Sequence, residues 1–334
     1  MLFLPEKIGT IFIMLGTECN CHCEYCSQNK YKEIKIQSIN PDIFKFIDNI
    51  LENQEEKIKM VFFGGEPLLH LDTIRLFCRT YRKKFKYALL TNGKLLSKDT
   101  IDFLNRFDAN ISISWDGRNS NITRHYDAIK EKYDLLPKIK NFYINAVLNH
   151  YSYPIEILED IDKISKYYTE ITGRPIGFGI DTIYNFELSN NDIFKIDLDK
   201  LKSQMNILYA NYKNNNSEIN DFYIKRIIDN LTYPDEITFY SSCQNGLNVL
   251  NLDLHGNLYL CHNNYDKKLG TIYSNIDEYT NTYNSFFNIQ ERFEKYCINC
   301  SIKKYCKGGC LLLTDEQMPT YCNQKLAHYG FLAQ

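Results

Sequence analysis

The sequence has no apolar run of about 18 residues, the shortest that would indicate a membrane-spanning helix. Its first residues, MLFLPEKIG, are too short and become charged too soon for a secretory signal. Long basic runs are also missing, and the formal net charge is -2, which argues against nucleic acid as the main partner. We therefore predict a cytoplasmic protein that binds neither membranes nor nucleic acid.

Cysteine is missing from residues 79–242, although the whole chain has 12. Four cysteines lie at 19–26, one is Cys78, and seven lie between 243 and 334. A reducing cytoplasm excludes a disulfide framework, so these residues point to metal binding. The sequence therefore predicts two metal-rich ends separated by a long stretch without cysteine.

Short β-branched apolar runs alternate with longer amphipathic runs in the first half of the chain. The predicted strands are 10–15, 59–63, 87–91, 110–115, 143–148 and 176–180, and two of the predicted helices are 42–53 and 72–85. Cys78 falls on the apolar face of the second helix, so we expect it in the core rather than on a metal. Alternation of strands and helices predicts parallel strands, in an open sheet or a barrel.

The pattern changes after residue 180. Residues 197–213 and 219–231 are predicted to form two helices, and the apolar alternation around DLHGNL predicts a β-hairpin with Gly256 in its turn. The remainder is rich in cysteine and resembles loop structure. We find no internal repeat and no linker long enough to make the two parts independent.

Each distinctive motif follows a predicted strand. The run GTECNCHCEYC follows the first strand, GGEP (64–67) the second, NG (92–93) the third and DG (116–117) the fourth, while Asn145 lies in the fifth. The carboxyl ends of parallel strands share one face and build the site there. The sequence therefore predicts that these loops converge.

The spacing Cys19-x3-Cys23-x2-Cys26, with Tyr25 before the last cysteine, resembles the signature of radical S-adenosylmethionine (radical SAM) enzymes. FFGGEPLL (62–69) resembles the second motif of that family, and the resemblance covers roughly residues 8–182. It implies a partial (β/α)6, TIM-like barrel in an α/β protein. We expect the radical SAM core at 1–186 and a helical connection at 187–240.

The resemblance implies that three cysteines hold three irons of a [4Fe–4S] cluster, while the fourth iron chelates S-adenosylmethionine. Cys21 does not fit the Cys19-x3-Cys23-x2-Cys26 spacing, so it is the spare cysteine, which is expected not to bind the cluster. Glu66 and the backbone of Gly64 and Gly65 would receive the ammonium of the cofactor, and Tyr25 would lie near its adenine. The other expected cofactor-binding residues are Asn92, Ser114, Arg124 and Asn145. A zinc knuckle made by all four cysteines is the alternative, and a solvated helix charge is the alternative for Arg124.

The C-terminal cysteines resemble a SPASM domain, which we expect at 241–334. This resemblance implies a distal [4Fe–4S] cluster on Cys297, Cys300, Cys306 and Cys322. It implies a nearer cluster on Cys243, Cys261 and Cys310, which gives three clusters in all. No further cysteine follows Cys243 closely, so the nearer cluster is expected to have an open or non-cysteine site. A zinc ribbon is the alternative.

By resemblance, the chain is expected to cleave S-adenosylmethionine reductively to a 5′-deoxyadenosyl radical, which abstracts hydrogen from a peptide. The expected product is a crosslinked, ribosomally made peptide, with a thioether or carbon–carbon bond. The expected electron donor is a flavodoxin or ferredoxin. The first strand begins near residue 10, so we expect leader recognition by a separate protein or another surface.

Two other functions are considered. Anaerobic sulfatase maturases resemble the chain in layout, but they place an aspartate base directly after the cysteine that matches Cys261, where this chain has His262. That histidine is the candidate catalytic base, or else a loop histidine without a role. A non-catalytic iron–sulfur electron carrier is the second alternative, against which GGEP and Tyr25 argue.

Overall fold

The structure is a computed structural model, and it describes residues 8–31, 34–35, 38–185, 187–214, 217–231, 248–286, 289–306 and 308–333. The chain forms two compact units. The first comprises Met1–Trp115, Arg124–Ile144 and Gln244–Phe287, and the second comprises Asp116–Thr123, Asn145–Cys243 and Asn288–Gln334. The two units are described separately below.

The strands are β1 (Thr10–Met14), β2 (Lys59–Phe63), β3 (Lys86–Thr91), β4 (Asn110–Ser114), β5 (Asn141–Leu148), β6 (Gly177–Thr182), β7 (Val249–Asp253), β8 (Asn257–Cys261) and β9 (Asn264–Thr271). They are hydrogen-bonded in the order β6-β5-β4-β3-β2-β1-β7-β8-β9. Neighbours from β1 to β4 pair in parallel. The predicted α/β fold with parallel strands is therefore confirmed, and the predicted strands agree with β1–β6 to within two residues at each end.

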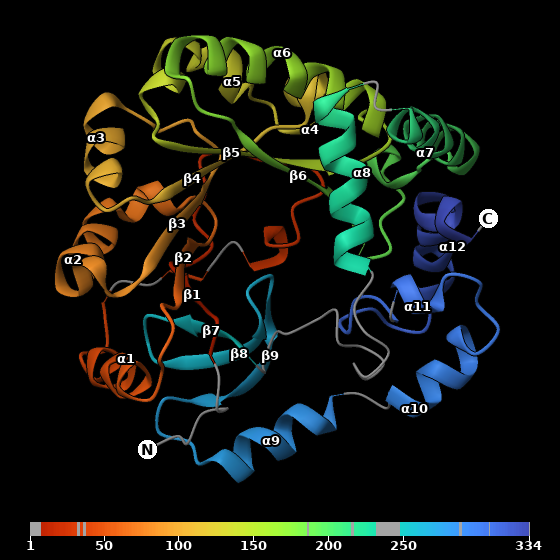
Figure 1. The fold of residues 1–334 in the computed structure, drawn as a ribbon. Helices are drawn as coiled ribbons and strands as arrows, with labels where there is room; N and C mark the ends of the chain where they lie inside the picture. The colour runs from red at the N-terminus through yellow and green to blue at the C-terminus, as the bar shows by residue number, and fades with distance from the viewer. Residues whose placement is uncertain are drawn as a thin grey trace. The chain divides into compact units, whose positions relative to one another are not determined.

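The longer helices of the first unit are α1 (Asp42–Glu52), α2 (Leu71–Tyr81), α3 (Lys98–Arg106) and α9 (Ile276–Ser285). Figure 1 shows α1, α2 and α3 along the outer side of β1–β4. They bury one apolar face each, as amphipathic helices that cover a sheet do. Cys78 is fully buried on α2, which confirms its predicted place in the core.

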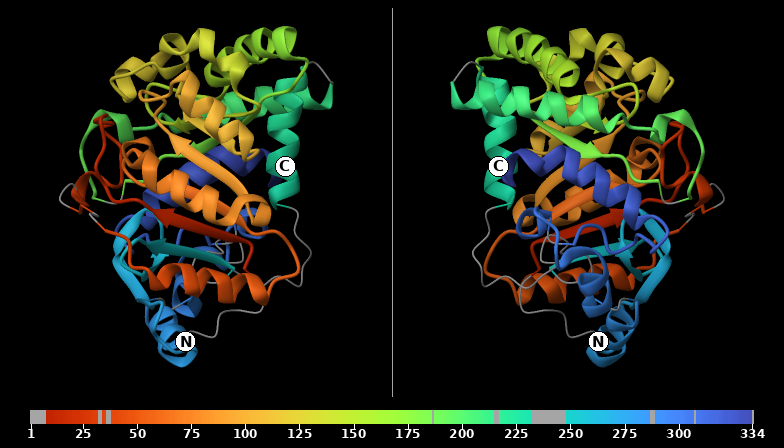
Figure 2. Two further views of the ribbon diagram at one scale, coloured as in Figure 1. Left: turned by 90° about the vertical axis from the view of Figure 1, so that its left-hand side faces the viewer. Right: turned by 90° about the vertical axis from the view of Figure 1, so that its right-hand side faces the viewer.

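The strands β7, β8 and β9 extend the sheet of the first unit beyond β1. β7 runs parallel to β1, with Thr10 opposite Val249 and Met14 opposite Asp253, and both views in Figure 2 show these strands next to each other. β7 and β8 form the predicted antiparallel hairpin. Gly256 lies in its turn with a φ of 89°, a conformation that other residues rarely adopt. Residues 249–271, expected in the C-terminal domain, thus share a sheet with the N-terminal strands.

The longer helices of the second unit are α6 (Pro154–Thr172), α7 (Leu198–Lys213), α8 (Glu218–Leu231) and α12 (Met318–Tyr329). The short helices of the chain are α4 (Ser120–Thr123), α5 (Ala128–Glu131), α10 (Ile289–Arg292) and α11 (Lys303–Cys306). The helices predicted at 197–213 and 219–231 are present as α7 and α8. Among the described residues, no helix is long and apolar enough to cross a membrane.

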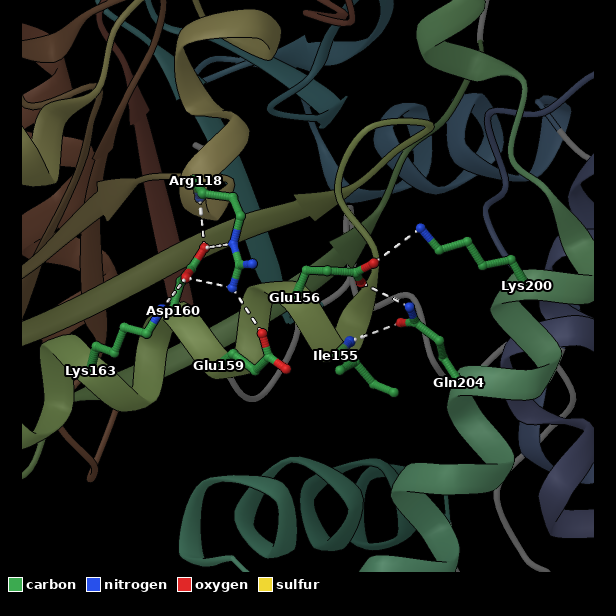
Figure 3. A network of polar contacts seen from close by, with 8 residues as sticks. All are labelled: Arg118, Ile155, Glu156, Glu159, Asp160, Lys163, Lys200 and Gln204. Carbon is green, nitrogen blue, oxygen red and sulfur yellow. Dashed lines mark hydrogen bonds and ion pairs between the residues drawn. The ribbon is translucent and has the colours of Figure 1, made fainter.

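A polar network fastens α6 within the second unit (Figure 3). Arg118 donates from Nε to Oδ2 and from Nη2 to Oδ1 of Asp160, both at 2.8 Å. The backbone N–H of Arg118 also donates to Asp160 Oδ2, at 2.8 Å. One turn earlier on α6, Glu156 pairs with Lys200 and accepts from Gln204 of α7. Asp160 is therefore the residue that ties the loop after β4 to this helix.

Asp160→Asn is expected to lower the free energy of unfolding by about 1–3 kcal/mol, because a buried charged acceptor of several hydrogen bonds is lost. Burial alone would raise the pKa of Asp160, but the hydrogen bonds from Arg118 and Lys163 lower it overall. A lowered carboxyl pKa stabilises the fold above the unfolded-state pKa of about 4, and this contribution disappears as the pH falls through the folded-state value.

Chemical denaturation at several pH values measures this effect. The difference in the free energy of unfolding between wild type and Asp160→Asn should be largest above about pH 5 and should narrow below about pH 4. The exposed pair of Asp192 and Lys195 offers a control, since Asp192→Asn should change stability little. If this difference in the free energy of unfolding stayed constant down to pH 2, the charge of the Asp160 carboxylate would not be what stabilises the fold.

Candidate active site

The cysteine loop, residues 17–28, follows β1 and is held by its own turns. The N–H of Cys26 donates to the carbonyl of Cys23 at 3.1 Å, and the N–H of Asn29 donates to the carbonyl of Cys26 at 3.1 Å. Asn29 Nδ2 donates to the carbonyl of Cys23 at 2.9 Å. These bonds fix Cys23 and Cys26 on consecutive turns of one segment.

Cys19 differs from its neighbour Cys21 in its contacts. The Sγ of Cys19 accepts from the N–H of Cys21 at 3.4 Å and from Nδ2 of Asn92 at 3.7 Å. It also interacts electrostatically with Cys26, while burial raises its pKa. Burial raises the pKa of Cys21 to about 11. Cys21 thus contributes its backbone N–H to the sulfur of Cys19, and its role as the spare cysteine stays a prediction.

Gly64 and Gly65 bring the end of β2 against the backbone of the cysteine loop. The N–H of Gly65 donates to the carbonyl of Gly16 at 3.0 Å, and that of Glu66 donates to the carbonyl of Glu18 at 2.8 Å. A Cβ on Gly65 would lie 2.2 Å from the oxygen of Glu18, and one on Gly64 would lie 2.6 Å from that of Gly16. Only glycine permits this approach, so both residues join the two motifs through main-chain contact.

Glu66 is almost fully buried, with 1% of its surface exposed. Its Oε1 accepts from Thr91 Oγ1 at 2.7 Å and from the N–H of Leu68 at 3.0 Å, and its Oε2 accepts from the N–H of Asn92 at 2.8 Å. Burial raises the pKa of Glu66, while these bonds oppose the rise. The carboxylate therefore ties the end of β2 to the end of β3, in addition to the predicted role toward a cofactor.

Asn92 connects the end of β3 to the cysteine loop. Its Nδ2 donates to Asn20 Oδ1 at 2.7 Å as well as to the sulfur of Cys19. Its backbone N–H is bound to Glu66, so one residue joins all three loops. The structure thus brings the cysteine, GGEP and NG motifs together, as their positions after parallel strands predict.

Tyr25 and Arg124 lie against each other in the first unit. The guanidinium carbon of Arg124 is 5.3 Å from the ring centroid of Tyr25, and Arg124 is buried with 8% of its surface exposed. The alternative of a solvated helix charge is therefore wrong for Arg124. Ser114 ends β4, whereas Asn145, in the second unit, donates to Asp181 Oδ2 at 3.1 Å. The cofactor contacts of these four residues stay predictions.

His262 packs among aromatic side chains directly after β8. Its ring stacks on Phe12 with centroids 3.9 Å apart and meets the edge of Phe63 at 4.6 Å. Burial lowers its pKa to about 4, and its Nδ1 has no hydrogen-bond partner among the described residues. The imidazole is therefore neutral and held between two aromatic rings, and its Nδ1 is buried.

Four C-terminal cysteines are neighbours in the second unit. The thiol of Cys322 interacts electrostatically with those of Cys306, Cys297 and Cys300, and burial raises its pKa to about 11. Cys306, Cys310 and Cys322 pack against an apolar cluster of Leu313, Met318 and Tyr321. Thiols in one partly apolar neighbourhood are suited to an iron–sulfur cluster, and the distal ligand set stays a prediction.

The predicted ligands of the nearer cluster are distributed differently. Cys261 ends β8 in the first unit, Cys310 belongs to the second, and Cys243 lies outside the described residues. This ligand set and its open site therefore stay predictions.

Within the described ranges, no three Cys, His, Asp or Glu side chains converge where one metal ion would be held. The zinc knuckle, the zinc ribbon and the ligand sets of the clusters all stay predictions.

Three residues of the site were not identified from the sequence. Thr91 is the hydroxyl partner of Glu66, and its place directly before the NG motif could have revealed it. Asn20 holds Asn92. Gln28 is buried and donates from Nε2 to the carbonyl of His262 at 3.2 Å, a contact across 234 positions that no local pattern predicts.

Comparison with known proteins gives three findings. Residues 13–169 match the Radical SAM superfamily. The radical SAM cyclopropyl synthase TigE of Paramaledivibacter caminithermalis is 26% identical, over 92% of this chain and 68% of that protein. The structure of anSMEcpe with bound AdoMet and Cp18Cys peptide has a TM-score of 0.72 at 19% identity, covering 97% of this chain and 96% of that one.

A second solved structure has the same fold. Streptococcus suis SuiB bound to S-adenosylmethionine has a TM-score of 0.61 at 17% identity, covering 92% of this chain and 74% of that one. At these identities the likeness concerns the fold alone.

Proposed function

The chain carries a radical SAM domain, and from this premise we propose that it modifies a ribosomally made peptide by hydrogen abstraction. The observation that carries the proposal is the junction of the cysteine loop with Gly64, Gly65 and Glu66. The loop that carries Cys19, Cys23 and Cys26 meets the buried residue Glu66 there, through main-chain contacts that leave no room for a Cβ on Gly64 or Gly65. An electron carrier would need the thiols alone.

The proposed cofactors are S-adenosylmethionine and three [4Fe–4S] clusters, one of them on Cys19, Cys23 and Cys26. When bound, they supply reductive cleavage of S-adenosylmethionine and hence a radical able to take a hydrogen atom from carbon. Two hydrogens would leave the peptide in total. One would leave as an atom, and the other as a proton together with an electron, for which a cluster held by the C-terminal cysteines would be the acceptor.

The residues of the chain have distinct proposed roles at this site. Asn92 and the N–H of Cys21 orient the sulfur of Cys19 through N–H···S bonds. Tyr25, held by Arg124, offers a ring face to the adenine. The carbonyls of Gly64 and Gly65 and the carboxylate of Glu66 receive the ammonium. His262 is neutral, and it is proposed to act as a hydrogen-bonding group rather than as the base that takes up the proton.

A groove of the second unit suits a peptide main chain. Two cavities of about 50 and 360 Å³ share Asn185, Phe194, Thr320 and Gln324. The amide side chains that line them are those of Asn185, Asn190, Gln317, Asn323 and Gln324. None of their described lining residues is a carboxylate, and aromatic rings such as Tyr184 and Tyr321 complete the wall. Neutral amides beside apolar rings match the alternation of amide and side chain in a peptide.

The bond formed is proposed to be a carbon–carbon bond or a thioether. TigE, which aligns with most of this chain, is named a cyclopropyl synthase and favours the carbon–carbon bond. A vacant site on the nearer cluster would favour a substrate thiol and a thioether. The electron donor is proposed to be a flavodoxin or ferredoxin, and leader recognition is proposed for a separate protein or for another surface of this chain.

Sulfatase maturation is the second candidate, supported by the fold shared with anSMEcpe. His262 argues against it, because burial keeps its imidazole neutral and lowers its pKa to about 4. A base of such low pKa accepts a proton less readily than an ordinary histidine.

Glu66→Gln is expected to weaken S-adenosylmethionine binding by about tenfold or more while iron content stays unchanged. A charge-assisted hydrogen bond contributes roughly 1.5–3 kcal/mol. The amide would also turn a donor toward the N–H of Asn92, which now donates to Oε2. Equilibrium binding to the reconstituted protein measures the loss. Glu18→Gln, at a half-exposed carboxylate of the same loop, is the control, and equal affinity in wild type and Glu66→Gln would remove Glu66 from the binding role.

Co-expression with short peptides encoded by neighbouring reading frames tests the substrate class. We expect a peptide whose mass falls by two hydrogens only in the presence of the enzyme. A cysteine-free peptide that still loses two hydrogens would favour the carbon–carbon bond. Oxidation of a sulfatase cysteine or serine, with no change in any peptide, would favour the second candidate instead.

A further inference from the structure

Lys325 is a buried ammonium group on α12. Only 6% of its surface is exposed. Its Nζ donates to Thr182 Oγ1 at 3.0 Å and to the hydroxyl of Tyr329 at 3.3 Å. It also lies 5.4 Å from the ring centroid of Tyr321 and 4.9 Å from that of Tyr329. The neutral partners satisfy its hydrogen bonds but leave its charge without an opposite charge.

No carboxylate in the described part of the second unit forms an ion pair with Lys325; every recorded ion pair of that unit involves other residues. Burial alone would lower the pKa of Lys325, but the groups around it raise that pKa overall and keep the ammonium charged. A buried charge is strongly unfavourable unless an opposite charge lies near it.

The distal thiols share the surroundings of Lys325. The ring of Tyr321, whose centroid is 5.4 Å from Nζ, belongs to the cluster against which Cys306 and Cys322 pack. Cys306 also acts electrostatically on Lys325, and it belongs to the four-thiol set with Cys297, Cys300 and Cys322. Thiolates bound to iron would provide the missing charge.

We propose that Lys325 is the counter-charge of the distal cluster and raises its reduction potential. This inference rests on the proposed ligand set of that cluster. Reduction adds one negative charge to a cluster, and a fixed positive charge in a medium of low dielectric constant favours the more negative state. Lys325 is thus a positioning residue that makes the distal cluster a better acceptor for the electron that leaves the substrate.

The test is a potentiometric titration, followed by electron paramagnetic resonance, of the reconstituted full-length protein. It is made in the background in which Cys19, Cys23 and Cys26 are all Ala, so that the N-terminal cluster does not contribute. In Lys325→Met, one C-terminal cluster should become at least tenfold harder to reduce at a fixed potential. For a one-electron couple this is a fall of about 59 mV or more in midpoint.

Two variants serve as controls. Lys213→Met removes an exposed ammonium that lies over the ring of Tyr209, and it should leave both midpoints unchanged. Tyr329→Phe removes a hydrogen bond of Lys325 but keeps the charge, so it should change the midpoint far less than Lys325→Met.

The outcomes separate this inference from the proposed function. Unchanged midpoints in Lys325→Met, with wild-type iron content, would overturn the inference and leave the proposed function intact. A parent protein without a C-terminal cluster would instead refute the ligand set. If Lys325→Met loses a C-terminal cluster that the parent protein keeps, Lys325→Arg is measured as well. A cluster with the parent midpoint in Lys325→Arg supports the counter-charge role, and a missing cluster overturns the inference.

Discussion

Replacing Cys19, Cys23 and Cys26 together with Ala is expected to remove about four of about twelve irons per chain and all cleavage of S-adenosylmethionine. The three thiols sit on one loop, and two of them are held on consecutive turns by main-chain bonds. Without them no protein ligand remains for the cluster that would reduce the cofactor. Iron analysis after anaerobic reconstitution, with 5′-deoxyadenosine measured by chromatography, gives both values.

Cys21→Ala is the matched control because Cys21 lies on the same loop. Its contact with Cys19 is made by its backbone N–H, which alanine retains. Iron content and cleavage should therefore stay close to wild type. Loss of the cluster in this single variant would show that Cys19, Cys23 and Cys26 are not the complete set of ligands.

Gly65→Ala is expected to destabilise the reconstituted protein by about 3 kcal/mol and to abolish most cofactor cleavage. The added Cβ would lie 2.2 Å from the oxygen of Glu18 and 2.5 Å from that of Thr17. Both atoms are backbone, so no side-chain rotation can relieve the overlap. The end of β2 would have to separate from the cysteine loop, which would displace Glu66 as well. Thermal unfolding and 5′-deoxyadenosine formation measure the two effects.

Gly330→Ala provides the comparison. A Cβ on Gly330 meets no atom within 4 Å, and its φ of −59° suits any residue. Such a change should leave cleavage intact and alter stability by less than about 1 kcal/mol. If Gly65→Ala behaved like Gly330→Ala, the close contact between the two motifs would not be essential.

Local patterns predicted the strands and the hairpin well. KMVFF is β2 without any shift in its ends, because a short apolar run that ends at two glycines is typical of a buried strand. Gly256 was predicted in the β7–β8 turn from the apolar alternation around DLHGNL, and its φ of 89° is one that most other residues avoid. The convergence of the motifs around Asn92 followed from the geometry of parallel strands.

Contacts between distant segments could not be predicted in the same way. The parallel pairing of β1 with β7 joins Thr10 to Val249, and nothing in either segment specifies the other. The stacking of His262 on Phe12 depends on that pairing. Glu66 was expected to serve a cofactor, but its bonds to Thr91 and Asn92 appear only once β2 and β3 are side by side.

Deuterium transfer tests the central claim most directly. The reduced, reconstituted protein is incubated anaerobically with S-adenosylmethionine and a deuterated peptide encoded by a neighbouring reading frame. The account predicts 5′-deoxyadenosine that carries one deuterium, together with a peptide that has lost two hydrogens. Absence of 5′-deoxyadenosine above the reductant-only control, or 5′-deoxyadenosine without deuterium beside an unchanged peptide, would contradict it.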